Sequence, residues 1–127
     1  MKRSKKLRFA AILSAMACLM ASVGMTASAE STSMTKGDMN AQFYWVNNRI
    51  VSTLAHNTVQ YTLTASHSGS YTNINGQVKS FGQSTTKYGY YVSNVEIKGV
   101  NMARAIGTAT FSGGSWDSRD KLSLKGN

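Results

Sequence analysis

The stretch TVQYTLTA, residues 58–65, decides the fold class of this chain. Val59, Tyr61, Leu63 and Ala65 alternate with polar residues, so apolar side chains recur with a period of two. This period predicts a β-strand with one buried face and one polar face. The sequence around it is rich in Ser, Thr, Asn and Gly, with Val, Tyr and Phe interleaved and no proline. Such a composition favours strands joined by turns.

Turn signals divide the rest of the chain into further strands. Asn75-Gly76 suits a type I′ hairpin turn, because both residue types tolerate a positive φ. Lys98-Gly99 predicts a second turn, and the SGGS stretch at residues 112–115 predicts a loop. The segments between these signals are predicted strands: Ser70–Ile74, Gln77–Phe81, Tyr88–Ile97, Val100–Phe111 and Trp116–Leu124.

Residues 39–54 fit two structures. A helix would place these apolar residues on one face: Met39, Phe43, Val46, Ile50 and Leu54. A hairpin would join two strands through Asn47-Asn48, and we favour it because aromatic and β-branched residues abound here. The chain is therefore predicted to be all-β, a small antiparallel β-sandwich or barrel-like domain of six to eight short strands, with a short helix within residues 39–54 as the alternative.

The N-terminus has the pattern of a secretory signal peptide. A lysine- and arginine-rich start precedes the uncharged, mostly apolar run Phe9–Met25, which is shorter than the roughly 20 residues of a membrane span. Ala27 and Ala29 supply the small side chains that a signal peptidase accepts, so cleavage is predicted before Glu30. We therefore expect a cleaved Sec-type signal peptide at residues 1–29, a flexible mature N-terminus at 30–38, and a single β domain at 39–127.

Localisation and redox state follow from this leader. Its length is typical of secreted proteins of Gram-positive bacteria, and no LPxTG-like pattern predicts covalent attachment to the wall. Cys18, the only cysteine, lies within the leader and lacks the upstream branched residue of a lipidation site, so we expect no lipoprotein. The mature protein is therefore predicted to be extracellular, disulfide-free and without thiol chemistry.

Charge argues against a nucleic-acid partner. The leader carries five of the 14 basic residues and none of the five acidic ones, so cleavage lowers the formal net charge from +9 to +4. The remaining basic residues are spread along the chain instead of clustering. A mild positive charge is compatible with an anionic wall or membrane surface.

No catalytic or metal-binding motif is present in the sequence. His56 and His67 would fall on opposite faces of one extended segment, so we expect two surface histidines with no shared role. Glu96 and Asp117 could form a carboxylate pair only if the fold brought them together. No GxSxG elbow or P-loop occurs. The sequence therefore predicts a non-enzymatic protein without cofactor or metal.

The aromatic clusters are the candidates for ligand binding. Phe43, Trp45 and Phe111 are expected in the core, because the mature chain has few leucines. The tyrosines of the Tyr88-Gly89-Tyr90-Tyr91 stretch carry polar tips suited to an interface. The predicted ligand-binding residues are Tyr88, Tyr90, Tyr91 and Trp116.

These features predict a small secreted binding protein that acts at a cell surface. Its expected partner is a wall polymer, a glycan or a surface protein, and it meets the membrane only during export. The alternative is a bacteriocin-like cationic antimicrobial protein, which would act on membranes. A third possibility is a self-assembling extracellular subunit, because the chain is a proline-free, polar β protein. The sequence leaves the oligomeric state open.

Overall fold

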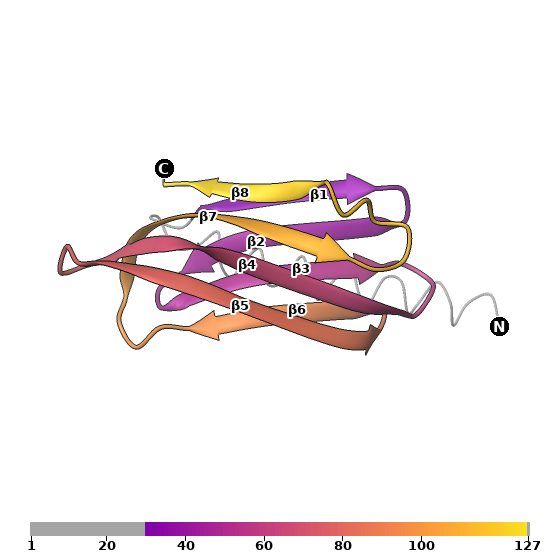
Figure 1. Ribbon diagram of the computed structural model, residues 1–127, viewed down its shortest axis with the longest axis horizontal. Helices are drawn as coiled ribbons and strands as arrows, with labels where there is room; N and C mark the ends of the chain where they lie inside the picture. Colours follow the sequence, from indigo (N-terminus) through magenta and orange to yellow (C-terminus); the bar gives the residue numbers. More distant parts are fainter. Residues whose placement is uncertain (1–29, 127) are drawn as a thin grey trace.

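The computed structural model describes residues 30–126, and every regular element within them is a strand (Figure 1). In chain order the strands are β1 (Ser31–Lys36), β2 (Met39–Val46), β3 (Arg49–His56), β4 (Tyr61–Asn73), β5 (Val78–Gly89), β6 (Tyr91–Ile97), β7 (Met102–Ser112) and β8 (Lys121–Lys125). They form two antiparallel four-stranded sheets, sheet A in the order β1-β2-β3-β6 and sheet B in the order β5-β4-β7-β8. The predicted all-β class is confirmed.

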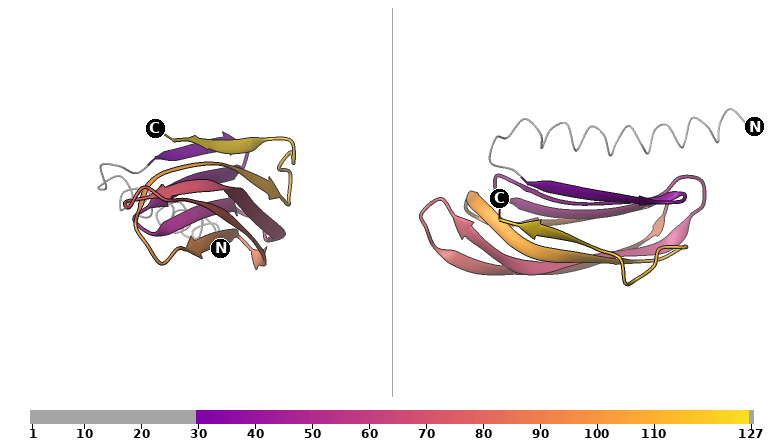
Figure 2. Two further views of the ribbon diagram at one scale, coloured as in Figure 1. Left: turned by 60° about the vertical axis from the view of Figure 1, so that its left-hand side comes forward. Right: turned by 90° about the horizontal axis from the view of Figure 1, so that it is seen from above.

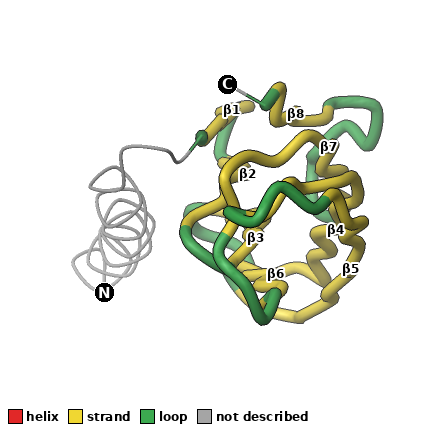
Figure 3. Tube along the Cα trace, turned by 90° about the vertical axis from the view of Figure 1, so that its left-hand side faces the viewer, coloured by secondary structure: helices red, strands yellow, loops and turns green. Residues whose placement is uncertain are grey.

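The two sheets lie face to face, and the chain crosses between them several times (Figure 3). Strands β2 and β3 form the favoured hairpin, so the helical alternative for residues 39–54 is wrong. Asn47, in the turn between them, is the only described non-glycine residue with a positive φ, at 53°. None of the elements in residues 30–126 is a helix long and apolar enough to cross a membrane.

Several strand boundaries differ from the sequence-based expectation: β4 begins at Tyr61 instead of Thr58, and β5 continues past Phe81 to Gly89. The expected last strand Trp116–Leu124 is also wrong in part, since β8 begins at Lys121 and residues 116–120 form a loop.

Three further differences change how the strands are arranged. Ser31–Lys36, expected to be flexible, forms strand β1 because its backbone pairs along its whole length with residues 39–44 of β2. The two strands expected within residues 58–74 are one long strand, β4. The expected strand Tyr88–Ile97 is divided, since β5 ends at Gly89 in sheet B and β6 begins at Tyr91 in sheet A.

The hairpin between β4 and β5 forms at the expected place but with another turn. A type I′ turn requires a positive φ at both central residues. Only Gly76 has one, at 82°. Its N–H donates to the carbonyl of Asn73 at 2.9 Å, and the Asn73 N–H donates to the carbonyl of Gln77 at 2.9 Å. This pattern is a three-residue loop with Gly76 in the left-handed position.

The core lies between the inner faces of the two sheets. Phe43 and Trp45 are fully buried and Phe111 is 2% exposed, as expected from the sequence. On sheet B, Gly69 pairs with Gly107, and the ring of Phe81 covers both glycines. A Cβ at either glycine would collide with backbone of the neighbouring strand, so these two positions set how closely β4 and β7 approach.

Each side of the sandwich is held by side chains, as the view from above helps to show (Figure 2). On one side, the Glu30 carboxylate accepts hydrogen bonds from the N–H groups of Lys125 (2.9 Å) and Gly126 (3.0 Å). This contact joins the start of β1 to the end of β8. On the other side, the amide of Gln83 on β5 donates to Asn94 Oδ1 and to the Val95 carbonyl on β6, both at 2.8 Å. Side chains therefore bridge the strands β5 and β6, which share no backbone ladder.

Candidate functional site

The outward surface of sheet B is lined by serine and threonine over all four strands. On β4 every second residue from Thr62 to Thr72 carries a hydroxyl, while the residues between them face the core. We call this surface the hydroxyl face. It consists of Thr62, Thr64, Ser66, Ser68, Ser70 and Thr72 on β4, Ser80, Ser84 and Thr86 on β5, Thr108, Thr110 and Ser112 on β7, and Ser123 on β8.

The strand registers arrange the hydroxyl face in rows. One row across the sheet consists of Ser84, Ser66, Thr110 and Lys121. The next consists of Gly82, Ser68, Thr108 and Ser123. Neighbouring strands lie about 4.8 Å apart and alternate residues about 6.8 Å apart, so the hydroxyls form a regular two-dimensional grid. Some pair with each other: Ser66 with Ser84 at 2.7 Å, and Thr64 with Thr86 at 2.8 Å.

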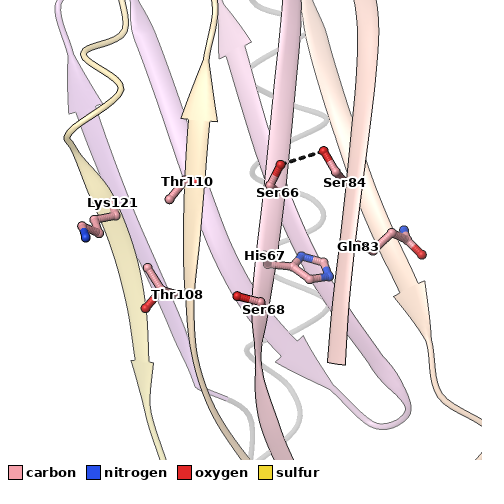
Figure 4. A pocket seen from close by; sticks show the side chains of 8 residues that line it. All are labelled: Ser66, His67, Ser68, Gln83, Ser84, Thr108, Thr110 and Lys121. Carbon is pink, nitrogen blue, oxygen red and sulfur yellow. Dashed lines mark hydrogen bonds between the residues drawn. The ribbon is translucent and has the colours of Figure 1, made fainter. Parts of the chain in front are cut away.

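A hollow of about 520 Å³ lies where these two rows meet (Figure 4). Most of its lining carries hydroxyl groups, Lys121 stands at its β8 side, and His67 and Gln83 also border it. The lining residues with hydroxyl groups are Ser66, Ser68, Ser84, Thr108 and Thr110. Gly82 adds no side chain within the second row, which leaves this part of the row open. A Cβ at Gly82 would meet no atom closer than 3.8 Å. The hollow therefore offers hydroxyl groups and one ammonium group to a ligand.

Behind the hydroxyl face lies a buried polar cluster centred on His67. The His67 side chain points inward from β4, stacks on Phe43 with ring centroids 5.8 Å apart, and meets the edge of Phe81. The ring nitrogens bond to side chains of sheet A: Nδ1 lies 2.9 Å from Ser52 Oγ and Nε2 lies 3.0 Å from Glu96 Oε1. The expectation of surface histidines is wrong, because His67 is 3% exposed and His56 is 5% exposed.

Hydrogen-bonding capacity assigns the protons in this cluster. A carboxylate accepts only, so Nε2 of His67 donates to Glu96 and Nδ1 accepts from the hydroxyl of Ser52. The Asn94 amide donates in turn to Ser52 Oγ at 3.1 Å. Lys98 pairs with the other oxygen of Glu96 at 3.1 Å. Every member has a partner, and the cluster fastens β4 of sheet B to β3 and β6 of sheet A.

The order serine, histidine, carboxylate is also that of a hydrolase triad. A nucleophile must meet its substrate, however, and Ser52 has no exposed surface. The described hollow is lined mainly by outward residues of sheet B, and although His67 and Gln83 also border it, Ser52 does not. The arrangement therefore supplies cohesion between the sheets and offers no route for a substrate to the Ser52 hydroxyl.

The cluster predicts a loss of stability in mild acid. Burial lowers the pKa of His67 below its ordinary value of about 6.5, against the opposing effect of Glu96. The unfolded chain then binds a proton that the folded chain resists, so stability falls as the pH drops below about 6.5. Burial alone would raise the pKa of Glu96, but hydrogen bonds from Lys98, the Gly82 N–H and His67 lower it, which extends the loss to lower pH.

Urea unfolding of residues 30–127 at a series of pH values checks this prediction. The expected slope between pH 7 and pH 5 is at most about 1.4 kcal/mol per pH unit for each proton bound. A His67→Gln variant lacks the titrating group and should show a shallower slope. A stability that is flat or rises from pH 7 to pH 5 in the parent protein would contradict the assignment.

The predicted ligand-binding residues lie near one end of the sandwich but not on one surface. Tyr88 is 65% exposed and lies beside Thr62 at the end of the hydroxyl face. Tyr91 begins β6 and lies on sheet A, with the Lys87 ammonium 5.2 Å from its ring. Tyr90 lies between β5 and β6 and is half-buried. Trp116 is buried against Phe111, so its ring is not available to a ligand.

The remaining candidates are also separated. Glu96 belongs to the buried cluster on β6, whereas Asp117 lies in the β7–β8 loop and pairs with Arg119 at 2.9 Å. Residues 30–126 hold no group of three or more side chains that could bind a metal. Of the predicted cleavage residues, Ala27 and Ala29 lie outside the described residues, and Glu30 makes the contact with β8 given above.

The hydroxyl face was missed at the level of sequence, although its signal is visible there. The hydroxyl residues at every second position from Thr62 to Thr72 continue the period of residues 58–65 on the polar side. His67 continues it on the apolar side, in phase with Leu63 and Ala65.

Comparison with protein-family models, with curated proteins and with solved structures finds no match to this chain.

Proposed function

We propose that this protein is an exported, non-enzymatic binding protein that holds a polymer of the cell surface against the hydroxyl face. The observation that supports this function is the hollowed grid of hydroxyls on sheet B. Serine and threonine hydroxyls both donate and accept hydrogen bonds, which suits a hydroxylated ligand. A grid that repeats along and across the strands suits a ligand that itself repeats.

The predicted signal peptide supports the compartment in this proposal, and the buried position of Ser52 supports a role other than hydrolysis. The edge strand β5 has features that oppose self-assembly through strand pairing. At positions between outward residues it carries Lys79 and Lys87, and charges at such edge positions oppose pairing with another chain. Binding of a polymer is therefore favoured over self-assembly.

Co-sedimentation of residues 30–127 with isolated cell-wall sacculi tests the proposal. We expect saturable retention that weakens at least about fivefold in Ser84→Glu, because the new carboxylate places charge beside the hollow without replacing a core residue. Ser33→Glu is the matched control, since it introduces the same charge at an exposed strand position in sheet A. It should bind like the parent.

Other outcomes would change the assignment. Loss of retention in Tyr88→Ala/Tyr90→Ala but not in Ser84→Glu would move the site to the tyrosines. Absence of retention together with leakage of dye from anionic vesicles would replace wall binding with the membrane-active alternative. Absence of both would leave neither function standing.

A further inference from the structure

The positive charge of the described domain is concentrated around sheet B. Three basic side chains pair with carboxylates: Lys36 with Asp120, Lys98 with Glu96, and Arg119 with Asp117. The basic residues that form no ion pair with another described residue are Arg49, Lys79, Lys87, Arg104, Lys121 and Lys125. All of these except Arg49 belong to strands of sheet B.

Three of these cations share the hydroxyl face itself. The registers place Lys121 beside Thr110, Lys125 beside Ile106, and Arg104 beside Thr72. These three neighbours lie at outward positions of their strands. Residues paired across a sheet point to the same side, so the three basic side chains project from the hydroxyl face. All three are exposed. They run along the β7–β8 side of the hydroxyl face.

The carboxylates of the described residues do not fully offset this charge on the hydroxyl face. Of the described acids, Glu96 is in the buried cluster and Glu30 holds the backbone of β8. Asp117 and Asp120 are occupied by basic partners, and Asp38 lies in the turn between β1 and β2 at the far sheet. The hydroxyl grid is therefore flanked by three basic side chains without ion-pair partners among the described residues, and the Glu30 carboxylate at the Lys125 backbone offsets only part of their charge. Such an excess of positive charge attracts an anion.

Spacing indicates that the anion is extended. Lys121 and Lys125 are four residues apart on one strand, with Ser123 between them, which corresponds to about 13–14 Å. One compact anion does not contact both positions. A linear polymer with a negative charge at regular intervals could meet both ammonium groups while its hydroxyl groups meet the serines and threonines alongside.

We propose that the ligand of the hydroxyl face is a linear polyol phosphate, with phosphate groups along Lys121, Lys125 and Arg104 and polyol hydroxyls on the grid. This inference rests on the proposed function and narrows its ligand class. Phosphate suits these side chains because ammonium and guanidinium groups form charge-assisted hydrogen bonds to its oxygens. A nucleic acid is less suited, because the face offers one exposed aromatic ring, Tyr88, at its end and no platform for stacked bases.

Two preparations of one cell wall separate this inference from the proposed function. Sacculi of a Gram-positive bacterium are used untreated and after hydrofluoric acid extraction, which removes phosphodiester-linked polymers and leaves the glycan. We expect retention of residues 30–127 on untreated sacculi and at least about a tenfold loss after extraction. Equal retention on both would overturn the polyol phosphate and keep a neutral glycan as the ligand. Absence of retention on both would overturn the proposed function as well.

Matched double variants test the surface. Lys121→Gln/Lys125→Gln should weaken retention on untreated sacculi by about tenfold. The control Arg49→Gln/Lys87→Gln removes the same charge at the start of β3 and over the Tyr91 ring, and it should change retention less than about twofold. Equal losses in the two variants would mean that net charge alone drives binding, which overturns the site.

Competition tests the chemistry of the ligand. Poly(glycerol phosphate) should release the protein from untreated sacculi at a lower phosphate concentration than single-stranded DNA does. A polyuronate of equal charge distinguishes phosphate from carboxylate as the recognised anion. If DNA or the polyuronate competes as well as poly(glycerol phosphate), then polyol phosphate is not the specific ligand and the inference fails.

Discussion

Replacing His67 with leucine is expected to lower the free energy of unfolding by about 3–5 kcal/mol. The substitution removes the donor to Glu96 Oε1 and the acceptor of the Ser52 hydroxyl at once. The side chain of Glu96 is 11% exposed. In the variant it would keep its ion pair with Lys98 but lose the hydrogen bond from His67. Removing the hydrogen-bond donor of a largely buried carboxylate is among the largest effects that a single substitution has.

The other buried histidine supplies the matched control for this experiment. His56 accepts hydrogen bonds from the N–H groups of Thr58 and Val59 and has no ionised partner in the described structure. His56→Leu should therefore cost about 1–3 kcal/mol, the price of unpaired buried polar groups. Urea or guanidinium unfolding followed by tryptophan fluorescence measures both. A loss of less than about 1 kcal/mol in His67→Leu would show that the cluster does not hold the sheets together.

Replacing Gly69 with alanine is expected to destabilise the protein by at least about 3 kcal/mol, the upper part of the range for overpacking. The added Cβ would overlap the carbonyl oxygen of Ile106 on β7, and it would lie 2.6 Å from the Cα of Gly107. Both obstacles are backbone atoms, so a change of rotamer cannot relieve them. β4 and β7 would have to separate at the centre of sheet B.

Gly82→Ala is the control for this prediction, because Gly82 lies in the same sheet with open space around its Cα. It should be neutral or stabilising by about 0.5–1 kcal/mol, since alanine has less freedom in the unfolded chain than glycine. Thermal unfolding of the two variants compares them. The Cβ added at Gly69 would also lie 2.8 Å from the Phe81 Cζ. The double variant Gly69→Ala/Phe81→Leu removes this side-chain clash and leaves the collision with the backbone. Full recovery in that double variant would contradict a backbone collision.

The period-two pattern made much of the fold predictable from sequence. Alternation at residues 58–65, turns at Asn47-Asn48 and Asn75-Gly76, and the aromatic content of residues 39–54 lead to the correct class and to most strands. Strand β1 could not be found this way. It is short, polar and without an alternating apolar set, and it forms because β2 offers a backbone edge to pair with.

The site was less predictable, because it depends on which strands become neighbours. Ser84 and Lys121 lie in one row only because β5, β4, β7 and β8 pair in that order. His67 meets Glu96 for the same reason, across the space between the sheets. The sequence predicted ligand binding at aromatic residues, yet one of them, Trp116, packs against Phe111 in the core. Local patterns identify faces of strands, whereas long-range pairing assembles the faces into a surface.

The contact between Glu30 and the backbone of Lys125 has a consequence for the folding kinetics of the chain. It joins groups 95 residues apart, nearly the whole span of the domain. Contacts at such separations carry the largest loop-closure entropy, so hairpins such as β2–β3 and β4–β5 can form well before it. We infer that a partly synthesised chain cannot complete this domain. Until the last strand arrives, β7 presents an open edge, and the final closure occurs only where the entire chain is free to fold.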